Sequence, residues 1–79
     1  MKVPRDIDSH QLIKLLYKFG YEPTRQSGSH IRLTTQQNGQ HHITIPHHDP
    51  LKIGTLNAIL TEVAQHLGIP KQDLVERLF

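Results

Sequence analysis

Histidine is the side chain best suited to chemistry at neutral pH, and this chain of 79 residues contains seven. An imidazole can take up or release a proton near that pH, and it can also ligate a metal ion. Five of the histidines lie in the middle of the sequence: His30, which follows Gly28-Ser29, then His41-His42 and His47-His48. Proton transfer, metal binding and ordinary surface exposure are the three roles to be weighed.

The spacing of the later histidines argues against a metal centre. Zinc sites draw on Cys, His and carboxylate ligands, but the chain has no cysteine, and Asp49 is the one carboxylate close by. Adjacent side chains on a strand also point to opposite faces, so a His-His pair on a strand diverges. We therefore predict no metal site and no cofactor.

An alternating apolar and polar run follows His30. Ile31 and Leu33 are apolar, and they alternate with Arg32 in the pattern of a half-buried strand. If the two apolar residues face the core, His30 and Arg32 share the opposite face, and Gly28 permits a tight turn beside them. These residues alone leave two readings open: an exposed histidine at a strand edge, or a site residue beside a cation.

Three strands in an antiparallel meander are expected to carry these residues. The first spans 21–27, where Pro23 suggests an edge strand. The second begins at His30, and Asn38-Gly39 is a strong hairpin-turn signal between it and a third strand over 41–45.

The same hairpin predicts where the strand histidines lie. Pairing around its turn places His42 opposite Gln36 or Thr35, some distance from His30, and puts His41 at the edge of the core. A direct role for His42 beside His30 is therefore not expected.

Helices with one apolar face flank the strands. One is expected over about residues 9–19, with Asp8 as its cap. A second follows a loop over 47–54 with Thr55 as N-cap, and Pro70 opens a short third helix. Packing both main helices on one face of the sheet gives the α+β order α-β-β-β-α plus a short helix, the architecture of double-stranded-RNA-binding domains.

Composition fits a single small domain over residues 1–79. The formal net charge of +2 is compatible with a nucleic-acid partner without requiring one. The chain has no cysteine, no apolar run near the roughly 20 residues of a membrane span, and no signal-peptide core. We therefore expect a cytoplasmic protein that does not enter a membrane.

Short motifs follow one another in a set order along the chain. They are Leu12–Leu16, Gly20-Tyr21, Arg25–His30, Ile45–His48, Gly54-Thr55-Leu56, Ile59-Leu60 and Gly68-Ile69. Together they resemble the HicA-like toxins of bacterial toxin–antitoxin pairs. Two features depart from that pattern. Ile31 stands where many members have a second histidine, and the stretch from Leu60 to Gly68 is about one helical turn longer than usual.

The resemblance implies an endoribonuclease that cleaves mRNA and stops growth, and a HicB-like antitoxin that binds it and covers the site. RNA carries its own nucleophile, the 2′-hydroxyl, so cleavage needs a base, an acid and positive charge, and no metal. The catalytic histidine of the family corresponds to His30 in this sequence. The substrate-binding residues that we predict are Gly28, Ser29, Arg32, His48, Lys52 and Thr55.

Two other functions stay open at this point. The first is a non-catalytic RNA-binding module of the same fold. A reader of double-stranded RNA needs a basic cluster on the second helix, and that stretch carries Glu62 and no Lys or Arg. The second is a protein-interaction domain that has lost activity.

Overall fold

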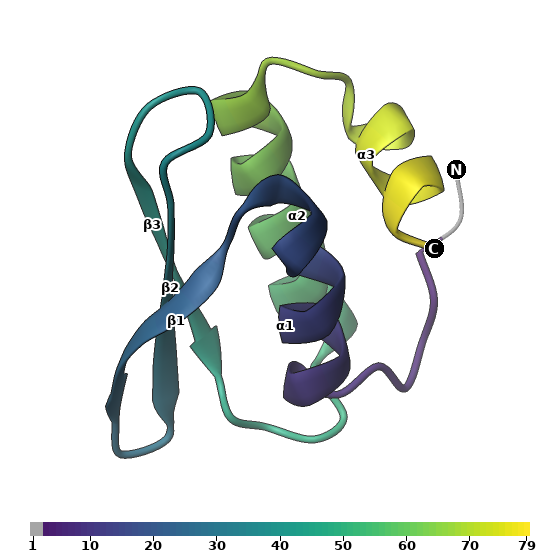
Figure 1. The fold of residues 1–79 in the computed structure, drawn as a ribbon. Coiled ribbons are helices and arrows are strands. Elements are labelled where there is room, and N and C mark those ends of the chain that lie inside the picture. The colour runs from purple at the N-terminus through teal and green to yellow at the C-terminus, as the bar shows by residue number, and fades with distance from the viewer. Residues whose placement is uncertain (1–2) are drawn as a thin grey trace.

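The computed structural model describes residues 3–79 and has the predicted α+β architecture (Figure 1). Its elements in chain order are α1 (Ser9–Leu16), η1 (Tyr17–Phe19), β1 (Glu22–Ser27), β2 (His30–Thr35), β3 (His41–Pro46), α2 (Ile53–Leu67) and α3 (Lys71–Leu78). The three strands form one antiparallel sheet in the order β1-β2-β3, with the helices gathered on one side of it. No helix among residues 3–79 is long and apolar enough to cross a membrane.

The first helix begins as the sequence predicts. Asp8 Oδ1 accepts the backbone N–H of Gln11 at 2.7 Å, and Gln11 Oε1 accepts the backbone N–H of Asp8 at 2.9 Å. This reciprocal capping box satisfies amide groups that the first helical turn leaves without partners. Residues 9–19 are helical as predicted, but the last turn of the helix is the tighter 3-10 helix η1. The helix ends at Gly20, whose φ is 78°.

The second helix begins three residues earlier than the sequence predicts. Lys52 is its N-cap, Leu56 N–H already bonds to Lys52 C=O, and no side chain caps the helix. The prediction that Thr55 is the N-cap is therefore wrong. The backbone turns into the helix at Ile53, which places Thr55 inside the first turn.

The β2–β3 register differs by one or two residues from the two predicted alternatives. His42 lies opposite Thr34, not Gln36 or Thr35, and His41 lies opposite Thr35. The reason is at the turn, where Thr35 Oγ1 accepts the backbone N–H of Gln37 at 3.1 Å and removes it from the strand ladder. The turn after Thr35 is consequently longer on the β2 side than a tight two-residue hairpin.

The core lies between the inner face of the sheet and the helices. Along β2, Ile31 and Leu33 are buried while His30 and Arg32 are exposed, as strand alternation predicts. The fully buried apolar side chains come from every layer: Leu12, Leu16, Tyr21, Leu33, Ile45, Leu60, Val63 and Leu74. Burial of each such side chain contributes about 1.5–3 kcal/mol to folding, which fixes the face that β2 presents to solvent.

A polar cluster joins the far end of the hairpin to α2. The hydroxyl of Tyr21 lies 2.8 Å from His41 Nδ1, and His41 Nε2 lies 3.2 Å from a carboxylate oxygen of Glu62. The ring of His41 stacks on that of His66 at 4.3 Å, and His66 Nε2 lies 2.9 Å from the carbonyl oxygen of Gln37. These contacts give His41 and His66 structural roles, because both rings are bonded within the fold.

We predict that truncation of Leu33 destabilises the fold far more than truncation of its neighbour Arg32. Leu33→Ala removes a fully buried side chain and lowers the free energy of unfolding by about 2–5 kcal/mol. Arg32→Ala, on the outer face, changes it by less than about 0.5 kcal/mol. Urea denaturation measures both, and equal losses would contradict the orientation of β2.

Alkaline pH gives a second prediction. Burial, and then the charge of Glu62, raise the pKa of Tyr21 to about 12 from 10.0. A pKa raised on folding gives stability that is present below pH 10 and lost as the pH rises towards 12. The stability difference between wild type and Tyr21→Phe should therefore shrink between pH 9 and pH 11.5 in urea denaturation. A constant difference over that interval would show that Tyr21 ionises as readily in the folded chain as in the unfolded one.

Candidate active site

The turn between β1 and β2 places His30 at one end of the sheet. Gly28 and Ser29 form this turn, and Gly28 has a φ of 57°, in the left-handed region that favours glycine. His30 is the first residue of β2, is exposed, and pairs with Ser27 on one side and Pro46 on the other. The predicted catalytic residue therefore lies where the first turn meets the last residue of β3.

The loop that follows β3 is held against this turn. The backbone N–H of His47 donates to the carbonyl oxygen of Ser29, which extends the β2–β3 contact beyond Pro46. The next residue, His48, has Nδ1 3.0 Å from the carbonyl oxygen of Pro50. Because a carbonyl only accepts, Nδ1 carries the proton in this contact, and Nε2 of the neutral ring is free to accept one.

A small hollow of about 180 Å³ opens beside the same loop. It is lined by Pro46, His48, Leu51, Lys52 and Thr55. Three of the predicted substrate-binding residues, His48, Lys52 and Thr55, therefore gather on one surface. Pro46 belongs to the lining and also pairs with His30, so the hollow adjoins the strand end that carries the predicted catalytic histidine.

The hollow is suited to an anion. The first turn of α2 borders it, and no side chain caps the free N–H groups of that turn. Free amides and the helix dipole favour negative charge at a helix N-terminus, and the ammonium group of Lys52 adds a full positive charge. Phosphate is the kind of group that such a surface binds.

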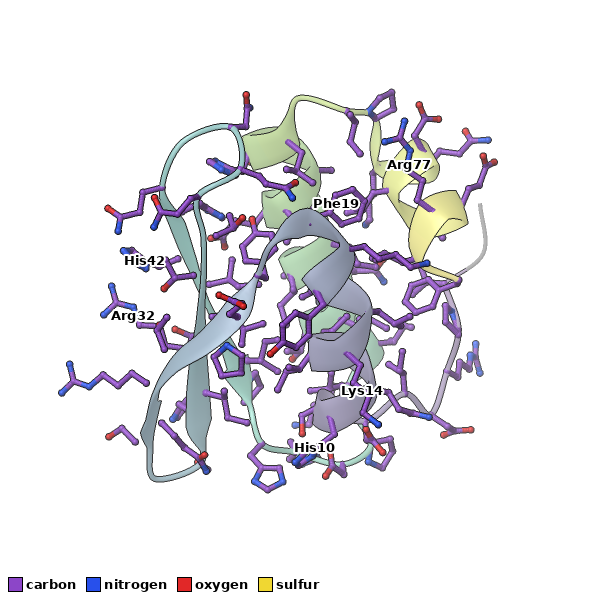
Figure 2. All side chains as sticks on the ribbon, viewed as in Figure 1. His10, Lys14, Phe19, Arg32, His42 and Arg77 are labelled. Atoms are coloured by element: carbon purple, nitrogen blue, oxygen red, sulfur yellow. The ribbon has the colours of Figure 1, made fainter. Side chains whose placement is uncertain are left out.

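The outer face of the sheet carries two guanidinium groups that continue from this end. Arg32 lies two residues beyond His30 on the same face, and Figure 2 shows it pointing away from the helices. Arg25 on β1 lies directly opposite Arg32 in the ladder. Sequence reasoning missed Arg25, because β1 has no buried residue and so shows no apolar alternation that assigns its side chains to a face.

His42 does not join His30. Its Nδ1 lies 2.8 Å from Thr34 Oγ1, and Thr34 is four residues from His30 along the same strand, about 13 Å at the usual rise per residue. His42 points out from the sheet (Figure 2). The structure thus separates it from the turn and the loop, as the sequence predicted.

Another histidine reaches this end of the molecule from α1. The ring of His10 lies 5.3 Å from that of His47, and His47 Nε2 lies 3.5 Å from Asp49 Oδ2. The backbone N–H and the hydroxyl of Ser9 both donate to Asp49 Oδ1, at 2.8 and 3.0 Å. The backbone hydrogen bond is the main reason why the pKa of Asp49 is lowered. Local sequence gives no signal for His10, because only the fold brings α1 to the loop.

The arrangement can perform acid–base chemistry on a bound phosphate. It offers the exposed imidazoles of His30 and His48, the ammonium group of Lys52 and the free amides of the first turn of α2. These are the groups that move protons and balance negative charge.

Comparison with known proteins identifies a family for this chain. The family model of the HicA toxin of bacterial toxin–antitoxin systems matches residues 9–68, which run from the start of α1 to the end of α2 and include every predicted site residue. No curated protein and no solved structure matched the chain. Since the match covers well over half of the sequence, the chain belongs to the HicA toxin family, and membership implies an antitoxin as its partner.

Proposed function

We propose that this chain is a toxin endoribonuclease that cleaves mRNA without a metal ion and uses His30 as its catalytic residue. The observation that carries the proposal is the junction between the Gly28-Ser29 turn and the loop after β3, where His47 N–H bonds to Ser29 C=O. That junction brings the strand end of His30 beside the hollow lined by His48, Lys52 and Thr55.

In this mechanism His30 removes the proton from a 2′-hydroxyl, and the resulting oxygen attacks the adjacent phosphorus. The bond from phosphorus to the 5′-oxygen breaks, and a second group gives that oxygen a proton. We assign this role to His48, whose Nδ1 contact with Pro50 leaves Nε2 to carry the transferred proton. The products are a 2′,3′-cyclic phosphate and a 5′-hydroxyl, so the proton removed at one oxygen is matched by the proton delivered at the other.

The remaining predicted residues bind the phosphate backbone in this proposal. Lys52 and the first turn of α2, including Thr55, hold the phosphate in the hollow. Arg32 supplies a guanidinium on the outer face beside His30, and the exposed turn of Gly28 and Ser29 lets the RNA approach closely.

The antitoxin in this proposal is HicB-like and acts by covering the same surface. The turn, residues 47–50 of the loop after β3, and His30 and Arg32 on the outer face of the sheet are all exposed. A protein that covers them would exclude RNA from His30 and His48 together.

A non-catalytic RNA-binding module is the second candidate. The observation that favours it is the exposed outer face of the sheet, where Arg25 and Arg32 pair across β1 and β2. Such a module binds RNA but leaves it intact, so a cleavage assay distinguishes the two functions.

Replacement of His30 tests the proposed chemistry. His30→Ala should reduce cleavage of purified mRNA by about 10²–10⁴-fold, the usual contribution of one proton-transfer group, and should abolish growth arrest in bacteria that express it. His42→Ala is the matched control, because it removes another exposed histidine of the sheet. A wild type that binds RNA without cutting it would favour the binding module, and a His30→Ala variant that remains toxic and cleaves RNA would refute the proposal.

Replacement of two residues of the hollow should separate binding from chemistry. Lys52→Gln removes a phosphate contact and should raise KM several-fold, whereas His48→Asn should lower kcat by about 10²-fold or more. Lys14→Gln, on α1, is the control for loss of one lysine and should change neither constant (Figure 2). Steady-state cleavage of a labelled oligonucleotide gives both constants. If His48→Asn changes only KM, His48 binds the substrate and is not the acid.

A further inference from the structure

The start of α1 and the loop after β3 bring together three ionisable side chains to which the proposed mechanism gives no role. They are His10, His47 and Asp49, and one ligand atom from each lies within 4.8 Å of the others. We propose that these three residues bind one divalent transition-metal ion of the zinc type, with water completing its coordination.

The ligand set determines the class of ion. Two imidazole nitrogens and one carboxylate oxygen suit zinc and its transition-metal neighbours, whereas magnesium and calcium prefer oxygen ligands alone. In a tetrahedral zinc site, bonds of 2.0–2.2 Å place neighbouring ligand atoms about 3.3–3.5 Å apart. His47 Nε2 and Asp49 Oδ2 are already 3.5 Å apart. All three side chains are exposed, so small rotations can bring His10 to the same spacing.

Asp49 is oriented for this role by its other oxygen. Ser9 is fully buried, and its N–H and hydroxyl both donate to Oδ1, which directs Oδ2 towards His47. A metal-binding carboxylate that is fixed by hydrogen bonds of this kind costs less ordering when the ion arrives.

The two histidines are also attached to fixed backbone. His10 is the second residue of α1, directly after Ser9 and within the capped first turn. The backbone N–H of His47 is bonded to Ser29. Figure 2 shows His10 at the end of the molecule where the loop after β3 passes the start of α1. An ion held here would link α1 to the loop and keep water in its fourth position, as sites with three protein ligands do.

This inference revises the sequence-based prediction of no metal site. That prediction considered His41, His42, His47 and His48, and it was right that the pair on the strand diverges, because His41 bonds to Tyr21 and Glu62 whereas His42 bonds to Thr34. It could not include His10, which the fold supplies. None of the three proposed ligands is among the residues assigned to RNA cleavage. A result against the metal site therefore leaves the proposed function intact, and a result against the proposed function leaves the metal site intact.

Calorimetric titration of the full chain, prepared without a histidine tag, with zinc chloride tests the site. Wild type should bind one equivalent, and His10→Ala and Asp49→Asn should each weaken binding at least tenfold. His42→Ala is the matched control and should bind as wild type does. Asp49→Asn retains an oxygen that can accept from Ser9, so it tests the ligand without removing that contact.

Thermal unfolding gives an independent readout that needs no enzymatic activity. Saturating zinc should raise Tm by several degrees in wild type and His42→Ala, because an ion that binds only the folded chain stabilises it, and the same zinc concentration should raise Tm clearly less in His10→Ala. Three results would each overturn the proposal: no binding by wild type, equal binding by His10→Ala, or a comparable loss in His42→Ala.

Discussion

The pairing of β2 with β3 is the constraint on which the rest of this molecule depends. It places His30 opposite Pro46, and one further hydrogen bond, from His47 to Ser29, continues the contact into the loop. A turn early in the sheet and a loop after its last strand thereby become one surface. Without that register, His30 and the hollow beside α2 would be unrelated features on separate segments.

Burial of the inner face maintains this register. Ile31 pairs with Ile45, and Leu33 pairs with Ile43, so a slip of one residue would turn the two buried side chains of the slipped strand towards solvent. The loss would amount to several kcal/mol, a large part of the stability of so small a domain. The side chains suited to chemistry, His30 and Arg32, lie on the opposite face of β2. Strand alternation places them there without removing any side chain from the core.

Sequence reasoning succeeded where the physical rule is periodic. Alternation along β2 correctly placed His30 and Arg32 outside and Ile31 and Leu33 inside, and the capping box at Asp8 and Gln11 correctly located α1. It failed where a side chain competes for the backbone or where distant segments meet. The hydroxyl of Thr35 accepts the backbone N–H of Gln37, and this bond shifted the turn. The helix α2 begins at Ile53, before the predicted cap at Thr55. The positions of Arg25 and His10 depend on strand pairing and on contacts between distant segments, which the local sequence does not specify.

The central claim is that an RNA hydroxyl, and no metal-bound water, is the nucleophile at the junction of turn and loop. Analysis of the ends of mRNA fragments, produced by wild-type protein in excess EDTA, tests it most directly. The account predicts undiminished cleavage, 5′-hydroxyl and 2′,3′-cyclic phosphate ends, and no cleavage where the residue at the cut carries a 2′-deoxy sugar. Fragments with 5′-phosphate ends, or cleavage that stops with EDTA, would contradict it.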